Sequence, residues 1–391
     1  MFEFNRRARP LATPKLTLGK ANLLANPPIS APPSNVAPTL SVSVLIDTYN
    51  HERFIEKAIN SVLEQDFPAA EREIIVVDDG SIDRTPEIVQ CFEPNLRYIR
   101  KENGGQASAF NAGIPECRGQ NIAFLDGDDY WLPGKLSRVT EVLSKNPAVG
   151  FVGHAIKESL PDGQERISAL AKDEKFRIQS LDSAKLFRLR KSLLGTSRMT
   201  MRAEIARRIL PVPEALVFEA DEYLFTLAAA MSEVVILKEP LTCYVIHGSN
   251  LYVSAGSGKA GLRRKQQVMA ELASSLQKAL QAQGLPTDVG DGVVEIVQAE
   301  ADQFRLMLDG GASWETVRAE NKLFEVLHDD ASKSQKFFRA LSMIPAFVLP
   351  PRWFYAGRRW LGDQTWYRSV RQEALPVPGI SAVSNCEESK I

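Results

Sequence analysis

Between residues 43 and 153, five short strand-type segments alternate with stretches of helical periodicity, and this alternation constrains the fold more than any other feature. The strand-type segments are 43–46, 73–77, 96–99, 121–125 and 149–153. Helices are expected between them, because the apolar residues there recur at helical spacing. Buried strands joined through helices form a mainly parallel sheet with helices on both faces. The predicted fold class is therefore α/β.

Composition and pattern divide the chain into four parts, of which the first is rich in proline and the third has only helical patterns. The predicted parts are 1–39 as a disordered tail or linker, 40–255 as the α/β domain, 256–372 as a helical C-terminal region and 373–391 as a second tail. Within the second part, residues 160–190 are polar and irregular and are expected to be an insertion.

Charge and cysteine content exclude several classes of protein. The formal net charge of −1 argues against a nucleic-acid-binding protein. The four cysteines are far apart and form no CxxC pair, so a disulfide framework or a zinc ribbon is not expected and a reducing compartment fits best. We find no signal-peptide pattern and no apolar stretch long enough to span a bilayer, and we expect a cytoplasmic location.

Acidic residues directly follow three of the predicted strands. They are Asp47 after the first, Asp78 and Asp79 after the second, and Asp126, Asp128 and Asp129 after the fourth. The carboxyl ends of parallel strands share one edge of a sheet, and ligands bind outside that edge. We therefore expect the three acidic groups to converge on one rim. The plainer alternative for each group is a turn or a helix cap, which Asp also favours.

Carboxylates that converge need a positive charge to neutralise them. Mg²⁺ takes carboxylate, phosphate and water oxygens, and Mn²⁺ also accepts imidazole. In the run Asp126-Gly127-Asp128-Asp129, the glycine permits close approach and two carboxylates follow it. The pattern predicts Mn²⁺ or Mg²⁺ as a cofactor beside a diphosphate.

Four stretches of the chain resemble family 2 of the glycosyltransferases, the large inverting family with the GT-A fold. They are 42–50 (VSVLIDTYN), 77–85 (VDDGSIDRT), 103–113 (NGGQASAFNAG) and 124–129 (FLDGDD). Their order and spacing agree with the family over residues 40–135, and the likeness is looser beyond. The resemblance implies a GT-A-type sheet that binds the nucleotide of a sugar donor.

The resemblance also implies roles for single residues. The base pocket would be lined by Thr48, Tyr49, Asn50, Asp78 and Asp79. Asp126 would lie near the ribose and diphosphate. The sugar-diphosphate would be approached by the segment that holds Asn103, Gly104, Gln106 and Asn111. Asp128 would ligate the metal through the family's DxD motif. Two positions depart from the family: Asp47 often corresponds to proline and so has no assigned role, and Phe110 often corresponds to a basic residue.

The second half of the site is expected to come from residues 218–225 and 244–250. The first of these segments resembles the family's acidic motif at a helix start, so Asp221 is the predicted catalytic base, with Glu222 or Glu219 as alternates. Acidic residues also decorate helix N-termini to complement the dipole, which is the plainer explanation.

Histidine and small polar residues complete the candidates. His247 follows a predicted strand at a position where similar enzymes often carry a histidine that ligates the metal or contacts the diphosphate, so it is the predicted second metal ligand. The plainer alternative is a structural histidine, and His51 is the nearest rival as a ligand. Residues 195–197 (Gly-Thr-Ser) resemble a family segment near the acceptor; the alternative is an ordinary turn.

The predicted function is inverting transfer of a sugar from a nucleoside-diphosphate sugar, with UDP as the commonest nucleotide among look-alikes, to an acceptor hydroxyl. Polysaccharide or glycolipid synthesis of bacterial type would suit such an enzyme, with a saccharide or a lipid-linked acceptor. Two alternatives stay open. A sugar nucleotidyltransferase would show a glycine-rich basic loop after its first strand, where this chain has Asp47-Thr48-Tyr49-Asn50. A non-catalytic protein that binds sugar nucleotides is the other.

Residues 345–372 mix aromatic side chains with arginines. Such a mixture is typical of a segment at a membrane interface, which would place the protein at the inner face of the membrane. The alternative is that these aromatics pack on the catalytic domain while the arginines are solvated.

Overall fold

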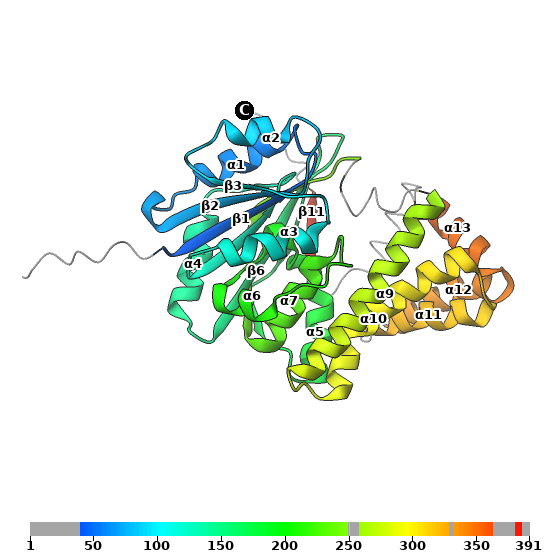
Figure 1. The fold of residues 1–391 in the computed structure, drawn as a ribbon. Coiled ribbons are helices and arrows are strands. Elements are labelled where there is room, and N and C mark those ends of the chain that lie inside the picture. The colour runs from blue at the N-terminus through cyan, green and yellow to red at the C-terminus, as the bar shows by residue number, and fades with distance from the viewer. Residues whose placement is uncertain (1–39, 249, 251–257, 328–331, 363–379, 385–391) are drawn as a thin grey trace, which may run out of the picture. The chain divides into compact units, whose positions relative to one another are not determined.

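The computed structural model describes residues 40–248, 250, 258–327, 332–362 and 380–384 (Figure 1). Its described strands form one mixed sheet in the order β11-β7-β6-β9-β4-β1-β2-β3, and β10 pairs with β5, β6 and β8. The strands are β1 Val42–Thr48, β2 Arg72–Asp78, β3 Arg97–Arg100, β4 Asn121–Asp126, β5 Tyr130–Trp131, β6 Val149–Ser159, β7 Glu165–Leu170, β8 Glu174–Phe176, β9 Thr200–Arg202, β10 Glu233–Val245 and β11 Ile380–Ser384.

The strands β4, β1, β2 and β3 are parallel neighbours, and their register brings the acidic strand ends together. Asp47 pairs with Asp126 across β1 and β4, and Thr48 pairs with Asp78 across β1 and β2. The carboxyl ends of these strands therefore share one edge, as the sequence predicts.

Successive residues of β1 point to opposite faces of the sheet, and both faces are covered. Leu45 belongs to a core with residues of α3, α6 and α7, while Val44 and Ile46 belong to a second core with residues of α1. Figure 1 shows α1 and α2 on one side of the sheet and α3, α6 and α7 on the other. The helices of this region are α1 Ile55–Leu63, α2 Thr85–Gln90, α3 Gln106–Gly113, α4 Lys135–Lys145, α5 Leu181–Arg190, α6 Ala203–Ile209 and α7 Ala220–Met231.

The other half of the sheet contains both strand directions. β9 runs antiparallel to β4 and β6, and β10 runs parallel to β6. The short 3₁₀ helix η4 (Thr196–Arg198) precedes β9, and the long strand β10 ends just before His247. The predicted α/β class, with a mainly parallel sheet and helices on both faces, is confirmed, with the refinement that the sheet is mixed.

The expectation that residues 160–190 are an irregular insertion is wrong. They form β7, β8 and most of α5, which begins with a capping box made by Ser180 and Ser183. Most residues of β7 are only half-buried, so the strand shows no apolar run. Pairing with β6 and β11 holds β7 through its backbone instead. The strand β11 lies in the part expected to be a tail.

The predicted helical C-terminal region is confirmed. Its helices are α9 Gly258–Ala282, α10 Thr287–Asp309, α11 Ser313–Leu327, α12 Lys333–Val348 and α13 Pro351–Gly362. Leu272 and Leu276 of α9 and Val293 of α10 are buried in the same core as α7. None of the helices in the described ranges is both long and apolar enough to cross a membrane.

Candidate active site

Two neighbouring carboxylates stand at the edge of the sheet where β1 and β4 end. Asp47 and Asp126 are register partners, and Oδ1 of Asp47 is buried without a hydrogen-bond partner among the described residues. Burial, together with the charge of Asp128, raises the pKa of Asp47 well above its usual range, and burial with the charge of Asp47 does the same for Asp126. These two groups therefore favour a cation or hydrogen-bond donors beside them.

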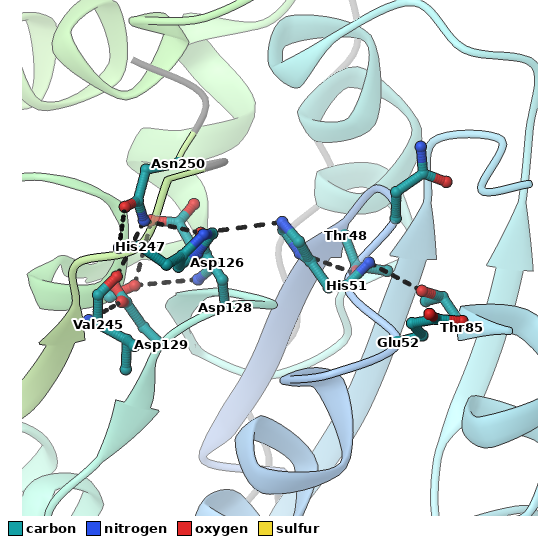
Figure 2. A network of polar contacts seen from close by, with 12 residues as sticks. Thr48, His51, Glu52, Thr85, Asp126, Asp128, Asp129, Val245, His247 and Asn250 are labelled. Atoms are coloured by element: carbon teal, nitrogen blue, oxygen red, sulfur yellow. Dashed lines mark hydrogen bonds and ion pairs between the residues drawn. The ribbon is translucent and has the colours of Figure 1, made fainter. Parts of the chain in front are cut away.

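The turn after β1 is fastened to the turn after β2. Asn50, at a φ of 57°, donates its backbone N–H to Ser81 Oγ, 2.9 Å away, and accepts at Oδ1 from the N–H of Ile82. The backbone N–H of His51 donates to Thr85 Oγ1 at 2.9 Å, and its ring Nδ1 lies 3.1 Å from Thr48 Oγ1 (Figure 2). Tyr49 projects outward and is 39% exposed. Thr48, Tyr49 and Asn50, three of the residues predicted to line the base pocket, thus belong to one braced loop.

Asp78 and Asp79 are both buried, and the protein itself supplies hydrogen-bond donors to both. Asp78 accepts from the N–H of Ser81 at 2.7 Å and from the Tyr98 hydroxyl at 2.6 Å. Burial and this bond to Asp78 raise the pKa of Tyr98. These contacts support the turn-forming explanation for Asp78, while its role toward a base stays a prediction.

The carboxylate of Asp79 shapes the loop that follows β3. It accepts from Lys101 Nζ at 2.7 Å and from the N–H groups of Gly104 and Gly105, the latter at 2.7 Å. Asn103 donates to the carbonyl of Asp79. Gly105 has a φ of +82°, and a Cβ there would lie 2.5 Å from Cα of Val217. Asp79 therefore fixes the loop that carries the predicted sugar-diphosphate contacts.

Gln106 and Asn111, the polar side chains of α3 predicted to approach the donor, have different surroundings. Gln106 donates to Thr196 Oγ1 at 3.0 Å and accepts from the N–H of Ala220 at 3.0 Å, so it joins η4 to the start of α7. Both ends of the Asn111 amide pair with the backbone of Val212 at 2.8 Å. The structure thus brings Gln106 to the candidate site and gives Asn111 a contact that anchors the chain before α7.

Asp128 meets residues that follow β10. Its Oδ2 lies 3.0 Å from Nε2 of His247 and 3.2 Å from Nδ2 of Asn250 (Figure 2). Burial acts to raise the pKa of Asp128, but the bond to His247 and the nearness of His51 outweigh it, so the pKa lies below its ordinary value. His51 Nε2 is 3.8 Å from the same oxygen, and burial lowers the pKa of His51. Asp128 is therefore ionised and held by nitrogen groups.

Asn250 is the residue of this cluster that sequence reasoning missed. It is 2% exposed, it accepts from the N–H of His247 at 2.6 Å and it donates to the carbonyl of Val245 at 2.9 Å. The ring of His247 also stacks on Phe54, with centroids 4.3 Å apart. The Gly-Ser-Asn run after a strand was the only signal available. These contacts fix His247 against Asp128.

Asp129 is hydrogen-bonded to the last residue of β10, next to the Asp128–His247–Asn250 cluster. Its Oδ1 accepts from the N–H of Val245 at 3.0 Å, and burial with the charge of Asp128 raises the pKa of Asp129 to about 8. A Cβ at Gly127 would lie 2.6 Å from Thr48 Oγ1, so glycine permits the close approach of this loop to β1. The acidic run is thus clamped between the ends of β1 and β10.

Thr196 and Ser197 join the acidic strand ends to Asp221. Ser197 Oγ donates to Asp126 Oδ2 at 3.2 Å, and the N–H and hydroxyl of Thr196 donate to Asp221 Oδ2 at 3.0 and 3.1 Å. Both residues are almost fully buried. The carbonyl of Ser197 accepts from Lys135, Trp131 and Thr242. Residues 196 and 197 therefore form a buried, hydrogen-bonded bridge within the 3₁₀ turn η4, and a contact with the acceptor stays a prediction.

Asp221 lies in the first turn of α7 and differs in its surroundings from Glu222. Its Oδ1 accepts from the N–H of Glu222 at 2.9 Å, and the side chain is half-buried. Glu222 is 5% exposed and pairs through both oxygens with Lys191 Nζ, at 3.1 and 3.2 Å. Glu219 precedes the helix at a φ of 59°. The carboxylate of Glu222 is thus paired with a lysine, whereas Asp221 accepts hydrogen bonds from Thr196 and from a backbone N–H, and Asp221 as the base stays a prediction.

The donor set at Asp128 fits a divalent cation only with help from a ligand. Two ligands at right angles on bonds of about 2.1 Å lie about 3 Å apart, which matches the 3.0 Å between Asp128 Oδ2 and His247 Nε2. Across the described ranges, no group of three or more His, Cys, Asp or Glu side chains could hold a metal. One carboxylate and one imidazole suit Mn²⁺ or Mg²⁺ when phosphate and water oxygens complete the shell.

The sequence profile of the family described as Glycosyl transferase family 2 matches residues 43–206. An uncharacterized glycosyltransferase of Nostoc sp. is 30% identical over 240 residues, which are 60% of this chain and 73% of the relative. A second one, from Rickettsia prowazekii, is 29% identical over 46% of this chain and 56% of its own length. The chain belongs to glycosyltransferase family 2.

A solved structure shares the fold at low sequence identity. S. aureus TarS 1–349, in complex with UDP-GlcNAc, has a TM-score of 0.55 and 18% identity, and the match covers 82% of this chain and 92% of that one. This likeness extends beyond the 43–206 segment and supports the GT-A fold for the region that holds Asp221 and His247. The alternative of a sugar nucleotidyltransferase is set aside by the family.

Proposed function

We propose that this glycosyltransferase moves a sugar from a nucleoside-diphosphate sugar to an acceptor hydroxyl in one inverting displacement. The observation that carries the proposal is the Thr196-Ser197 bridge. It joins Asp126, at the end of β4, to Asp221, at the start of α7. A carboxylate that can take a proton thus stands beside a carboxylate edge suited to a cation and a diphosphate.

The donor would lie along the carboxyl ends of β1, β2 and β4. The braced loop of Thr48, Tyr49 and Asn50 offers one exposed aromatic ring and backbone groups to a base. Asp78 and Asp79 hold this loop and the 103–106 loop in place from beneath. The TarS complex with UDP-GlcNAc makes a UDP-linked sugar the first donor to test.

Asp128 and His247 would hold Mn²⁺ or Mg²⁺ at the diphosphate. The bound ion would stabilise the negative charge that develops on the leaving diphosphate. His51, Asn250 and the stacked ring of Phe54 keep the two ligands in place.

Asp221 would act on the acceptor. Its Oδ2 is fixed by Thr196, and its Oδ1 takes the proton of the acceptor hydroxyl as that oxygen attacks the anomeric carbon. The new carbon–oxygen bond forms while the bond from the anomeric carbon to the diphosphate oxygen breaks. One displacement inverts the configuration, so an α-linked donor gives a β-linked product.

The setting of the reaction follows from the same assignment. We propose residues 40–255 as the catalytic domain and 256–372 as an accessory helical region. The acceptor would be a saccharide or a lipid-linked saccharide in polysaccharide or glycolipid synthesis, on the cytoplasmic side of the membrane.

The proposal is tested by thermal denaturation with a panel of nucleotide sugars, with and without Mn²⁺. A ligand at 100 times its Kd stabilises the native state by about 2.7 kcal/mol through mass action. We expect UDP sugars to raise the Tm in the presence of Mn²⁺, and Asp128→Asn to remove the Mn²⁺-dependent part. Asp162→Asn, at an exposed turn, is the matched control. No shift with any nucleotide sugar would contradict the proposal.

A further inference from the structure

The helices α12 and α13 expose large apolar side chains on a scale that the rest of the described chain does not. The outer apolar face consists of Phe337, Leu341, Ile344, Phe347, Val348, Leu349, Trp353 and Trp360, each at least 40% exposed. Elsewhere in the described ranges, exposed large hydrophobic residues are single and scattered: Tyr49, Ile82, Leu181 and Trp314. Large apolar side chains exposed in such number on two consecutive helices indicate an interaction surface.

Along α12, four residues of the outer apolar face form a helical stripe. Phe337, Leu341, Ile344 and Val348 recur at intervals of four, three and four residues along α12, which places them on one side. The opposite side of α12 carries Met343 and Ala346, which are buried against α10, α11 and α13. α12 therefore has one apolar face for its own core and a second one that no described residue covers.

Only some of the aromatic side chains predicted to lie at a membrane interface are exposed. Phe354 and Tyr355 are 4% and 2% exposed and belong to the internal core, and Arg358 pairs with the buried Glu320. Trp353 is 72% exposed and Trp360 is 63% exposed. Trp366 and Tyr367 lie outside the described residues. The available surface therefore begins earlier in the chain than residue 345.

The charge of the segment around the outer apolar face indicates what the face binds. Between residues 333 and 362 the sequence has lysines and arginines but no aspartate or glutamate, although the whole chain has a net charge of −1. Lys336 and Arg352 are exposed beside the apolar face. Exposed tryptophans and apolar side chains with cations at their margin match the interface of a bilayer that contains anionic lipid. A second copy of the chain would bring like charges together.

We propose that the outer face of α12 and α13 binds the surface of a membrane that contains anionic lipid. The face lies in the membrane interface without spanning it, with the apolar side chains among the acyl chains and the cations at the headgroups. This binding requires no step of sugar transfer, so its test is independent of the proposed function.

The test is cosedimentation of the full chain with vesicles of phosphatidylcholine, with or without phosphatidylglycerol. We expect binding to vesicles that contain phosphatidylglycerol and weaker binding to phosphatidylcholine alone. The double variant Phe347→Glu/Trp353→Glu should lower the partition coefficient roughly tenfold or more, because two large side chains lose their burial. Lys336→Glu/Arg352→Glu should reduce binding only to the anionic vesicles.

Leu181→Glu, 54% exposed at the start of α5, is the matched control and should bind like the unmodified chain. Circular dichroism confirms that each variant folds. Equal binding by the unmodified chain and the Phe347→Glu/Trp353→Glu variant would overturn the proposal. Absence of binding to the vesicles that contain phosphatidylglycerol would overturn it as well. Self-association that the Phe347→Glu/Trp353→Glu variant abolishes would then show that the face joins two copies of the chain.

Discussion

The imidazole Nε2 of His247 lies 3.0 Å from Oδ2 of Asp128, although 119 residues separate the two in the chain. Asp128 follows β4, and His247 follows β10, which joins the opposite half of the sheet. A carboxylate and an imidazole at this separation fit two adjacent positions around one divalent cation. The contact also connects the acidic run that follows β4 to the residues that follow β10.

Asp128→Asn is expected to abolish most of the transfer while the fold stays intact. The amide keeps the size of the side chain and removes the negative charge that a cation needs. Product formation should fall by about 100-fold or more if the ion supplies several kcal/mol of charge stabilisation. The measurement is release of nucleoside diphosphate at increasing Mn²⁺, with circular dichroism as the check on folding. Unchanged turnover would remove Asp128 from the metal site.

Asn250→Ala is expected to weaken the response to the metal without removing a ligand. The substitution deletes the donor to Asp128 Oδ2 and the acceptor for the N–H of His247, so both ligands lose their support. Residues that orient metal ligands typically contribute about 10–100-fold to metal affinity or activity. The Mn²⁺ concentration for half-maximal turnover should rise accordingly. If that concentration stays the same, Asn250 does not position the ligands.

Glu222 and Lys191 are expected to behave as a structural ion pair. Lys191→Met leaves Glu222 buried without its cation and should lower the free energy of unfolding by about 3 kcal/mol. Lys191→Met/Glu222→Leu should recover most of this loss, because no buried charge is left. Lys145→Met breaks the exposed pair with Glu141 and should change the free energy of unfolding by less than about 1 kcal/mol. Denaturant titration provides the values.

The same pair separates Glu222 from Asp221 as a base. Glu222→Gln should lower stability but keep the rate constant of transfer within about one order of magnitude. A loss of rate as large as that of an Asp221 variant, at a temperature where the variant is folded, would instead make Glu222 the base.

His154 gives the stability a dependence on pH. Its side chain is fully buried between Ala155 and Thr242, and burial, with the charge of Lys135, lowers its pKa well below 6.5. The folded protein thus keeps this ring neutral at a pH where the unfolded chain protonates it. The contribution of His154 is constant above pH 6.5, and stability falls below it by about 1.4 kcal/mol per pH unit until the folded pKa is reached.

His154→Gln should remove that slope. The difference in free energy of unfolding between pH 7 and pH 5 should shrink by up to about 2 kcal/mol relative to the unmodified chain, as chemical denaturation at the two pH values will measure. An equal difference in both proteins would mean that the native state accommodates the protonated ring.

The sequence predicts the positions of the acidic strand ends because continuous apolar runs identify buried parallel strands, and those strands end at a common edge. The sequence pattern assigns no role to Asp47, because only the register of β1 with β4 places it beside Asp126. Asn250 and the Ser197 bridge depend on contacts between residues far apart in the chain. No local pattern carries that information, because it arises when β9 and β10 join the sheet.

The hydrogen bonds within the protein could not be predicted from the sequence either. An aspartate that binds a ligand and one that fixes a loop have the same letter, and only the donors around Asp79 and Asn111 show what those side chains hold. The prediction that residues 160–190 are an irregular insertion is wrong for a different reason. The strand β7 is held by backbone pairing with β6 and β11 while most of its side chains are only half-buried, so it has the composition of a loop.

The most direct test of the account is the effect of Asp221→Asn on donor binding and on transfer, measured on one preparation with Mn²⁺ present. A general base contributes about 10²–10⁴-fold to the rate. The account predicts that kcat falls by this factor while the Kd for the nucleotide sugar stays within about twofold, because the amide oxygen still accepts the hydrogen bonds from Thr196 and only the bond from the N–H of Glu222 is lost. An unchanged kcat, or a Kd that rises in step with the loss of rate, would contradict Asp221 as the group that deprotonates the acceptor.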